Sequence, residues 1–521
     1  MIPRLTNCLH VINNKQSQSV SDAKDALSAT MAQVSSSLWT PLVPNEGRND
    51  GIDAQTSRQG FGSVDDVIEE AKKQLWLAGP LIAVSLLQCS LQITSVMFVG
   101  HLGELALSGA SLASSFAAVT GFDILLGMAS ALETLCGQAY GAKQYHMLGV
   151  HMQRGMLTLV VVSIPLALIW FYTSTILIAL GQDHELSKEA GTFNRWMIPS
   201  LFAYSLLQCL NRFLQTQNNV FPMMISSGIT AFLHIIVCWA LCFKVGLGSK
   251  GAALAISISN WVNLLLLASY VIFSPVCKNT WTGFSKEALH DILSFIKLAI
   301  PSSIMICFEY LTFEMVVLLS GLLPNPKLET SVLSISLNTC WTVYMVSVGL
   351  GSAISTRVSN ELGAGRPQSA RLALQVMIIM ALSEGAAIAI ATVSVRHVWG
   401  KLYSNENEVI TYVAKMMPLL ALSDFLDGFQ CVLSGAARGC GWQNLCVYIN
   451  LGAYYVVGIP TAVLFAFILH IGGMGLWMGI ICALLVQVTA LVAVNACTDW
   501  SQEALKAADR VQDTSLVTDK Q

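Results

Sequence analysis

The chain has 521 residues, of which 54% are hydrophobic and only 11% are charged, and its formal net charge is −3. Soluble domains carry about 25% charged residues, so a chain this long and this apolar is a polytopic membrane protein. The small net charge and the lack of a basic stripe argue against a nucleic-acid partner.

Residues 1–70 are predicted to be a disordered cytoplasmic tail, because they are rich in Ser, Asn, Gln and Asp and contain no apolar segment. The segment lacks the hydrophobic region of a signal peptide and is too acidic for a transit peptide. Met31 within it is a candidate alternative start. At the other end, residues 499–521 are expected to form a short polar tail.

Between the tails lie apolar stretches of about twenty residues, the length that a helix needs to cross a hydrocarbon core of about 30 Å. We place twelve spans at 75–99, 108–131, 152–173, 193–211, 221–244, 251–274, 292–322, 330–352, 370–393, 409–431, 443–467 and 473–496. The long seventh span is expected to tilt or to extend beyond the bilayer.

The predicted fold class is an all-α membrane protein with twelve transmembrane helices in two pseudo-symmetric six-helix lobes. The N-lobe covers residues 71–275 and the C-lobe covers residues 291–498, with a cytoplasmic loop at 276–290 between them. If the N-terminus is cytoplasmic, the loops and flanks on that side carry more Lys and Arg than the opposite side does. This bias predicts that both termini are cytoplasmic.

The two lobes repeat each other in sequence but differ in their acids. Pro80 begins the apolar part of the first span and Pro301 begins that of the seventh, and eight residues later the chain has Gln88 in one copy and Glu309 in the other. An even number of spans per lobe inserts both copies in the same orientation, related by an axis along the membrane normal. The cleft between such lobes would expose a substrate to each side in turn.

A second pair of matching positions also has an amide in the N-lobe and an acid in the C-lobe. Pro199 is followed after nine residues by Gln208, whereas Pro418 is followed at the same spacing by Asp427. An ionisable side chain in the middle of the membrane is costly and is by default a functional hypothesis. A membrane protein with amides in one lobe and acids in the other suggests a proton-coupled transporter. The alternative is that each acid only makes a hydrogen bond between helices.

Five long motifs occur in the order typical of one known family. They are Met97–Leu105, Leu135–Tyr145, Leu319–Ser334, Arg357–Pro367 and Gly435–Gln443. With them the chain resembles the multidrug and toxic compound extrusion (MATE) transporters, and most closely the plant DETOXIFICATION proteins. The resemblance covers about residues 65 to 500. It implies twelve helices in two lobes and the export of organic compounds in exchange for cations.

The resemblance also implies roles for two residues. Plant-type members use one carboxylate on the seventh helix and another on the tenth for proton coupling, roles that fall here on Glu309 and Asp427. Bacterial relatives often use an aspartate on the first helix, but the segment Gln92–Met97 of this chain has no acid. That departure argues against coupling in the N-lobe and against sodium binding.

Further polar residues inside the spans are candidates for the cavity or the substrate site. Asp424 lies one turn before Asp427 and can share its face, whereas Glu314 points away from Glu309. Asp123 could bind a cationic substrate, although a local packing role is an alternative. The candidates are Gln430, Asp424, Glu314, Asp123, Gln88, Gln208, Asn338, Tyr310 and Tyr344.

Four residues at the cytoplasmic ends of the second and eighth spans are candidates for a gate or for a structural role. Glu133 and Gln138 follow the second span, and Arg357 and Glu361 form a possible ion pair at spacing i,i+4 after the eighth. These positions favour capping or gating over direct contact with substrate.

Other classes of protein fit less well. The sequence has no His-rich metal cluster, nucleophile elbow or phosphate loop, so we do not expect an enzyme with catalytic residues. We also expect no metal site and no cofactor, and the expected coupling ion is the proton. The 14 cysteines are scattered and are interpreted as buried thiols. A lipid or oligosaccharide flippase would need a basic cavity, which is not apparent. A channel or receptor is disfavoured by the duplicated lobes and their acids.

The resulting hypothesis is a secondary active transporter, a proton-coupled antiporter that exports secondary metabolites or xenobiotics from the cytosol by alternating access. Its expected partners are a small organic substrate, protons and the lipid bilayer, and the chain is expected to be a monomer. We expect a multi-pass protein of the plasma membrane or the vacuolar membrane.

Overall fold

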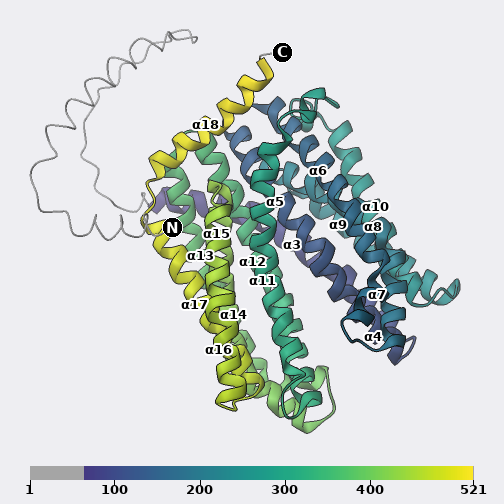
Figure 1. The fold of residues 1–521 in the computed structure, drawn as a ribbon. Helices are drawn as coiled ribbons and strands as arrows, with labels where there is room; N and C mark the ends of the chain where they lie inside the picture. Colours follow the sequence, from purple (N-terminus) through teal and green to yellow (C-terminus); the bar gives the residue numbers. More distant parts are fainter. Residues whose placement is uncertain (1–63, 520–521) are drawn as a thin grey trace, which may run out of the picture. The chain divides into compact units, whose positions relative to one another are not determined.

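The computed structural model describes residues 64–519. The predicted tail at 1–70 therefore lies outside the described residues, Met31 included, except for its last seven positions, which already belong to the first helix. The described residues form helices and short connections, without a strand. In Figure 1 the earlier helices, purple to teal, lie largely on one side and the later ones, green to yellow, on the other.

Long helices account for all twelve predicted spans. The helices are α3 (Val64–Gly100), α4 (Glu104–Ala117), α5 (Asp123–Gly141), α6 (Tyr145–Phe171), α7 (Thr173–Ala179), α8 (His184–Thr216), α9 (Phe221–Trp239), α10 (Ser249–Phe273), α11 (Ile292–Ser320), α12 (Pro326–Gly363), α13 (Pro367–Trp399), α14 (Asn407–Cys440), α15 (Gln443–Asn450), α16 (Ile459–Val463), α17 (Gly473–Ala496) and α18 (Trp500–Asp519). Short π-helical segments join α4 to α5 and α15 to α16, so each pair makes one span.

Eleven helical segments in the described part of the chain are long and apolar enough to cross a membrane. The fourth predicted span, α8, is not among them, because polar and charged residues occupy both of its ends. Asp183 caps this helix by accepting hydrogen bonds of 3.0 Å from the amides of Glu185 and Leu186. These bonds lower the pKa of Asp183, so the cap stays charged at neutral pH.

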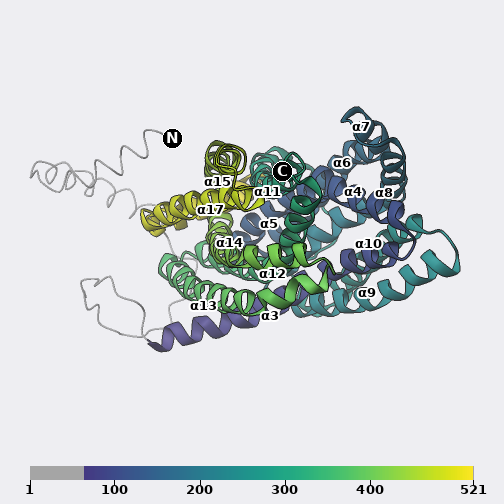
Figure 2. The same ribbon diagram turned by 90° about the horizontal axis from the view of Figure 1, so that it is seen from below.

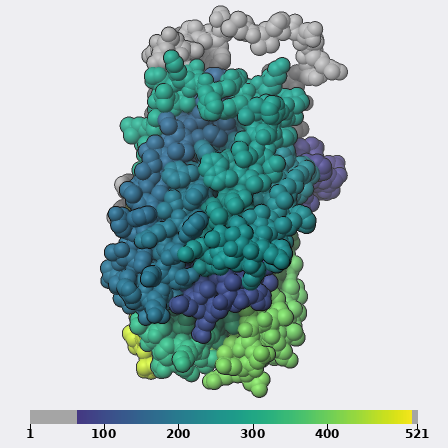
Figure 3. Space-filling model, turned by 90° about the vertical axis from the view of Figure 1, so that its right-hand side faces the viewer, coloured from purple at the N-terminus to yellow at the C-terminus, as the bar shows by residue number. Residues whose placement is uncertain are grey.

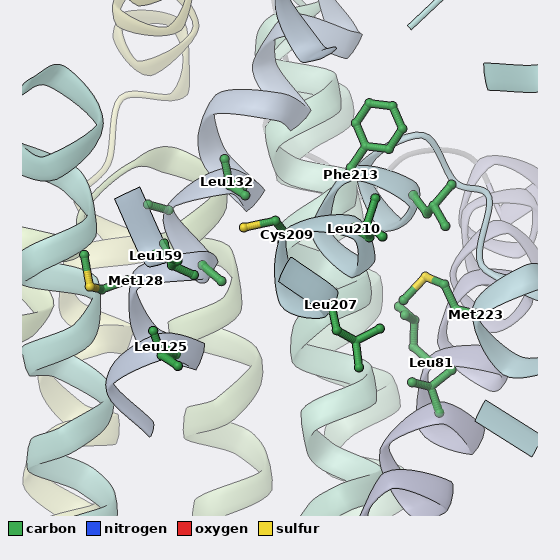
Figure 4. Packing of buried hydrophobic residues seen from close by; sticks show 14 of the residues in the cluster. Leu81, Leu125, Met128, Leu132, Leu159, Leu207, Cys209, Leu210, Phe213 and Met223 are labelled. Atoms are coloured by element: carbon green, nitrogen blue, oxygen red, sulfur yellow. The ribbon is translucent and has the colours of Figure 1, made fainter. Parts of the chain in front are cut away.

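The N-lobe is packed around apolar side chains from several helices. Figure 4 shows Leu125, Met128 and Leu132 of α5 near Leu159 of α6, with Cys209 of α8 pointing toward Leu132. Inside a bilayer the gain from such contacts comes from close packing, because lipid tails are as apolar as leucine. The outer surface of this lobe, blue to teal in Figure 3, belongs to helices that also carry exposed apolar side chains such as Phe232 and Leu265.

The C-lobe has its own core around Tyr454 and Trp477, both fully buried. Its helices α12 and α14 approach closely where glycines remove side chains from the contact. A Cβ atom at Gly351 would lie 2.9 Å from the carbonyl oxygen of Cys431, closer than real Cβ contacts occur. This approach brings α12 against the part of α14 that carries Asp427.

Proline occurs inside four of the long helices at the positions that the sequence repeat singles out. Pro80 lies in α3, Pro199 in α8, Pro301 in α11 and Pro418 in α14. Each proline removes one backbone hydrogen bond and can kink its helix. The duplicated prolines therefore place a weakened turn eight or nine residues before Gln88, Gln208, Glu309 and Asp427.

The predicted polar C-terminal tail is a helix, α18, seated on the ends of both lobes. Its residues Trp500, Ala504, Ala507 and Val511 are buried, because apolar side chains recur every three to four residues. Arg510 donates hydrogen bonds of 3.0 Å to Gln138 of α5 and to the carbonyl of Cys440 at the end of α14. The helix therefore touches an N-lobe element and a C-lobe element at once.

We expect Ala507→Asp to release α18, whereas Ala508→Asp should leave it in place. Ala507 is fully buried and its neighbour Ala508 is exposed, so the two variants add the same charge on opposite faces. An unpaired carboxylate in the buried position would cost about 3 kcal/mol or more. Limited trypsin digestion measures the release of α18, which should appear as faster cleavage after Lys506 and Arg510 in Ala507→Asp. Equal cleavage of both variants would contradict the packing of α18.

Candidate functional site

The two predicted coupling carboxylates lie together in the C-lobe. Glu309 comes from α11 and Asp427 from α14, and both are buried. The amide nitrogen Nε2 of Gln430 donates to Oε1 of Glu309 at 2.8 Å and to Oδ1 of Asp427 at 3.0 Å. Tyr344 of α12 donates its hydroxyl to the same Glu309 oxygen at 2.9 Å. Three helices thus converge on one pair of acids.

The Gln430 amide makes a further hydrogen bond that is consistent with its orientation toward the two acids. Ser434, one turn later on α14, donates to Oε1 of Gln430 at 2.9 Å. Ionised carboxylates only accept hydrogen bonds, so they take the amide nitrogen of Gln430, and the serine hydroxyl, which can donate or accept, donates to the amide oxygen. Spacings of three and four residues place Asp427, Gln430 and Ser434 along one face of the helix.

A pocket lies beside this pair. Its lining is formed by Glu309, Tyr310, Phe313, Leu337, Cys340, Trp341, Tyr344 and Asp427. The rings of Tyr310 and Trp341 meet edge to face with centroids 4.8 Å apart, and Trp341 packs on Tyr344 at 5.9 Å. These aromatic faces shield the acids from water and could contact a flat or cationic molecule.

Two more carboxylates lie near the site, one on α14 and one on α13. Asp424 is buried and its Oδ2 atom has no hydrogen-bond partner. Glu384 of α13, which the sequence reasoning missed, accepts a hydrogen bond of 3.4 Å from Ser347 of α12 and interacts electrostatically with Asp424. A signal was present, since Glu384 is the only acid in the predicted span 370–393.

The remaining cavity candidates lie elsewhere. Asp123 of α5 is half-buried and interacts electrostatically with Glu314 of α11. Gln208 is buried beside Tyr204. Neither Asp123 nor Glu314 belongs to the lining of the C-lobe cavity.

The last two candidates make no contact with the acid pair either. Gln88 keeps its amide nitrogen buried without a hydrogen-bond partner. Asn338 is exposed on α12 and does not line the cavity.

The gate candidate Glu133 joins the two lobes. It is 1% exposed and forms ion pairs with Arg212 of α8 at 2.8 Å and with Arg438 of α14 at 3.1 Å. Close by, Gln138 donates to the carbonyl of Gly439 at 3.1 Å. A buried carboxylate of the N-lobe therefore holds an arginine of each lobe.

Arg357 also pairs across helices at this end of the molecule. Besides Glu361 at 2.9 Å, the pair that the spacing predicts, it binds Glu70 of α3 with two hydrogen bonds of 2.8 and 2.9 Å. Glu70, which the sequence reasoning missed, is a buried acid close to the start of α3. These contacts and those of α18 keep the lobes together at the end that the charge bias predicts to be cytoplasmic. Figure 2 shows the helices from the opposite end.

The arrangement in the C-lobe is suited to binding and releasing protons. Two acids share one amide donor in a largely apolar surrounding, where an unneutralised charge is costly. A proton on either acid removes a buried charge and converts an acceptor into a donor. The hydrogen bonds that join α11, α12 and α14 must then rearrange.

Comparison with known proteins gives a consistent result. The family model MatE matches the chain over residues 80–240 and 301–464, so the two matches begin at Pro80 and Pro301 of the sequence repeat. Protein DETOXIFICATION 16 of Arabidopsis thaliana is 60% identical over 459 residues, which are 88% of this chain and 94% of that protein. Protein DETOXIFICATION 14 of the same plant is 46% identical over 88% of this chain and 95% of that protein.

Solved structures agree with these sequence matches. The crystal structure of the eukaryotic MATE transporter AtDTX14 superposes with a TM-score of 0.83 at 47% identity and covers 86% of this chain and all of that one. A mutant of the Vibrio cholerae MATE transporter VcmN has a TM-score of 0.74 at 17% identity, over 85% of this chain and 98% of that one. At this low identity the similarity concerns the fold alone.

Proposed function

Because the chain belongs to the MATE family of membrane transporters, we propose that it is a proton-driven antiporter that exports organic compounds from the cytosol. The observation that carries the proposal is the Gln430 amide, which donates to both Glu309 and Asp427 beside a cavity lined by aromatic rings. The substrates are secondary metabolites or xenobiotics, and the transporter works as a monomer in the plasma membrane or the vacuolar membrane with both termini in the cytosol.

The proposed cycle begins with the lobes joined at the cytoplasmic end by Glu133, Arg212 and Arg438. Protons from the acidic outer side bind Glu309 and Asp427, rearrange the hydrogen bonds of Gln430 and Tyr344, and weaken the hold on substrate. The lobes then rock so that the protons leave to the cytosol and substrate enters. Protons drive this motion because they bind the two states with different affinity.

The energy supplied by a proton gradient sets the expected size of the effect. One pH unit is worth about 1.4 kcal/mol per proton, which supports about tenfold accumulation of a neutral substrate for each proton exchanged. Accumulation of a cationic substrate also depends on the electrical potential. A measurement must therefore clamp that potential.

We expect proteoliposomes containing the purified protein to accumulate a fluorescent organic cation when the inside is acidic, with the potential clamped by potassium and valinomycin. A proton ionophore should abolish the accumulation, and empty liposomes provide the control for passive trapping. A panel of flavonoids and organic acids tests whether the probe is simply not a substrate. Failure of every compound to respond to the pH gradient would reject the proton-driven antiporter.

A further inference from the structure

We propose that Glu384 and Asp424 hold a proton between them, as a second proton-binding site of the C-lobe in addition to Glu309 and Asp427. The proposal rests on the proton-driven function above and adds a site to it. Glu384 lies on α13 and Asp424 on α14, two helices that pack against each other along the C-lobe.

The first support is the space between α12, α13 and α14 that the Glu384 carboxylate occupies. It reaches α14 at Gly428, where a Cβ atom would lie 3.4 Å from Oε2 of Glu384 and 2.9 Å from Oγ of Ser347. Ser347 of α12 meets the other oxygen of the same carboxylate at 3.4 Å. A residue without a side chain thus makes room for an acid from the neighbouring helix, directly beside Asp427.

The second support is an unpartnered oxygen. Asp424 is 8% exposed, and its Oδ2 atom is buried without a hydrogen-bond partner. A buried acceptor without a donor is costly, and a buried charge without a counter-ion is more so. Asp424 has a hydrogen bond with the Cys340 thiol, and the charged groups that interact with it are two further acids, Glu384 and Asp427. The group that best satisfies the free oxygen and both acids of the Glu384–Asp424 pair is therefore a proton.

The surrounding charges leave this role to a proton. Asp424 is met by Cys340 of α12 and by Asp427 of α14, and Glu384 is met by Ser347 of α12. Glu309 of α11 and Tyr344 of α12 interact with Asp427. The basic residues of α13 nearest to Glu384 are Arg371 and Arg396, which are 13 and 12 residues away along the helix. At 1.5 Å per residue they lie about 20 Å from it, and no ion pair found in the described chain includes Glu384 or Asp424.

The step itself is the binding of one proton. A proton from the outer side adds to a carboxylate oxygen of the Glu384–Asp424 pair, the net charge of the pair rises by one unit, from −2 to −1, and the same proton leaves to the cytosol when the lobes have moved. Because Asp424 interacts with Asp427, loading one site changes the charge that the other experiences. A proton on one site removes the repulsion that favours protonation of the other, so the two sites are expected to fill in sequence.

The test compares wild type with Glu384→Gln in proteoliposomes at a fixed pH gradient. We expect steady-state accumulation of substrate by Glu384→Gln to be about tenfold lower than that of wild type for each pH unit of gradient, because the variant exchanges one proton fewer per cycle. Substrate exchange without a gradient should continue. Glu384→Asp should restore much of the accumulation. Glu406→Gln, an exposed acid before α14, serves as the control.

A second measurement does not depend on transport. Infrared difference spectra between acidic and alkaline states should show a carboxylic-acid band in wild type that Glu384→Gln lacks and Glu406→Gln keeps. Gly428→Ala, which inserts a methyl group between Ser347 and Glu384, should weaken the same band. Unchanged accumulation and an unchanged band in Glu384→Gln would overturn the second site, whereas a wild type without gradient-driven transport would reject the proposed function instead.

Discussion

Replacement of Glu309 by Gln or of Asp427 by Asn is expected to abolish substrate accumulation driven by a pH gradient. An amide has the shape of a carboxyl group and cannot bind or release a proton near neutral pH. Its carbonyl oxygen can still accept the bonds from Tyr344 and Gln430 that Glu309 accepts, and the bond from Gln430 that Asp427 accepts. The cavity should therefore keep its form while the proton-binding group is lost.

Wild type is expected to accumulate substrate about tenfold for each pH unit and each proton exchanged, whereas the variants should reach only the passive level. The measurement is uptake into acid-inside proteoliposomes, together with substrate exchange at equal pH, which requires binding and lobe movement but no proton coupling. Glu408→Gln, an exposed acid in the first turn of α14, is the matched control and should behave like wild type. If either variant at the pair still concentrated substrate along the gradient, that acid would not be a coupling residue.

The second large effect is expected from Glu133→Gln, which should open the end of the molecule where the lobes now meet. The substitution keeps the size of the side chain but leaves Arg212 and Arg438, each 12% exposed, without their shared anion. Breaking a buried ion pair in this way costs about 3–5 kcal/mol, and opening the lobes hydrates both guanidinium groups. The balance between closed and open states should shift by roughly 10²-fold or more.

Distances between spin labels on the two lobes measure this shift. Lys143 follows α5 and Gln368 is the second residue of α13, and both are exposed. Cysteines at these positions accept labels in a background where the exposed Cys497 is replaced by serine. Glu133→Gln should add a longer distance to the distribution. Glu69→Gln removes an exposed ion pair with Lys73 and should leave the distribution unchanged, because surface pairs contribute little. A distribution that Glu133→Gln does not alter would show that this ion pair does not hold the lobes together.

Several features of the fold follow from local sequence alone. A run of about twenty apolar residues must form a helix in a bilayer, since each backbone polar group needs a partner within its own segment. This rule finds α8 as well as the more apolar spans, although its first turns carry Glu185, Lys188 and Arg195. The sequence predicts only a polar tail where α18 lies, because the apolar residues that this helix buries are few and are separated by polar ones.

The sequence by itself determined the membrane class, the duplicated lobes and the two acids, Glu309 and Asp427, that mark the C-lobe. Those features depend on composition, segment length and spacing along the chain. Only the tertiary structure decided that Gln430 bridges to Glu309, 121 residues away, and that Glu133 meets Arg438 across 305 residues. It also brought Glu384 to Gly428 and Asp424. Such pairs depend on which faces of distant helices meet, and helix packing settles that only when the whole bundle is assembled.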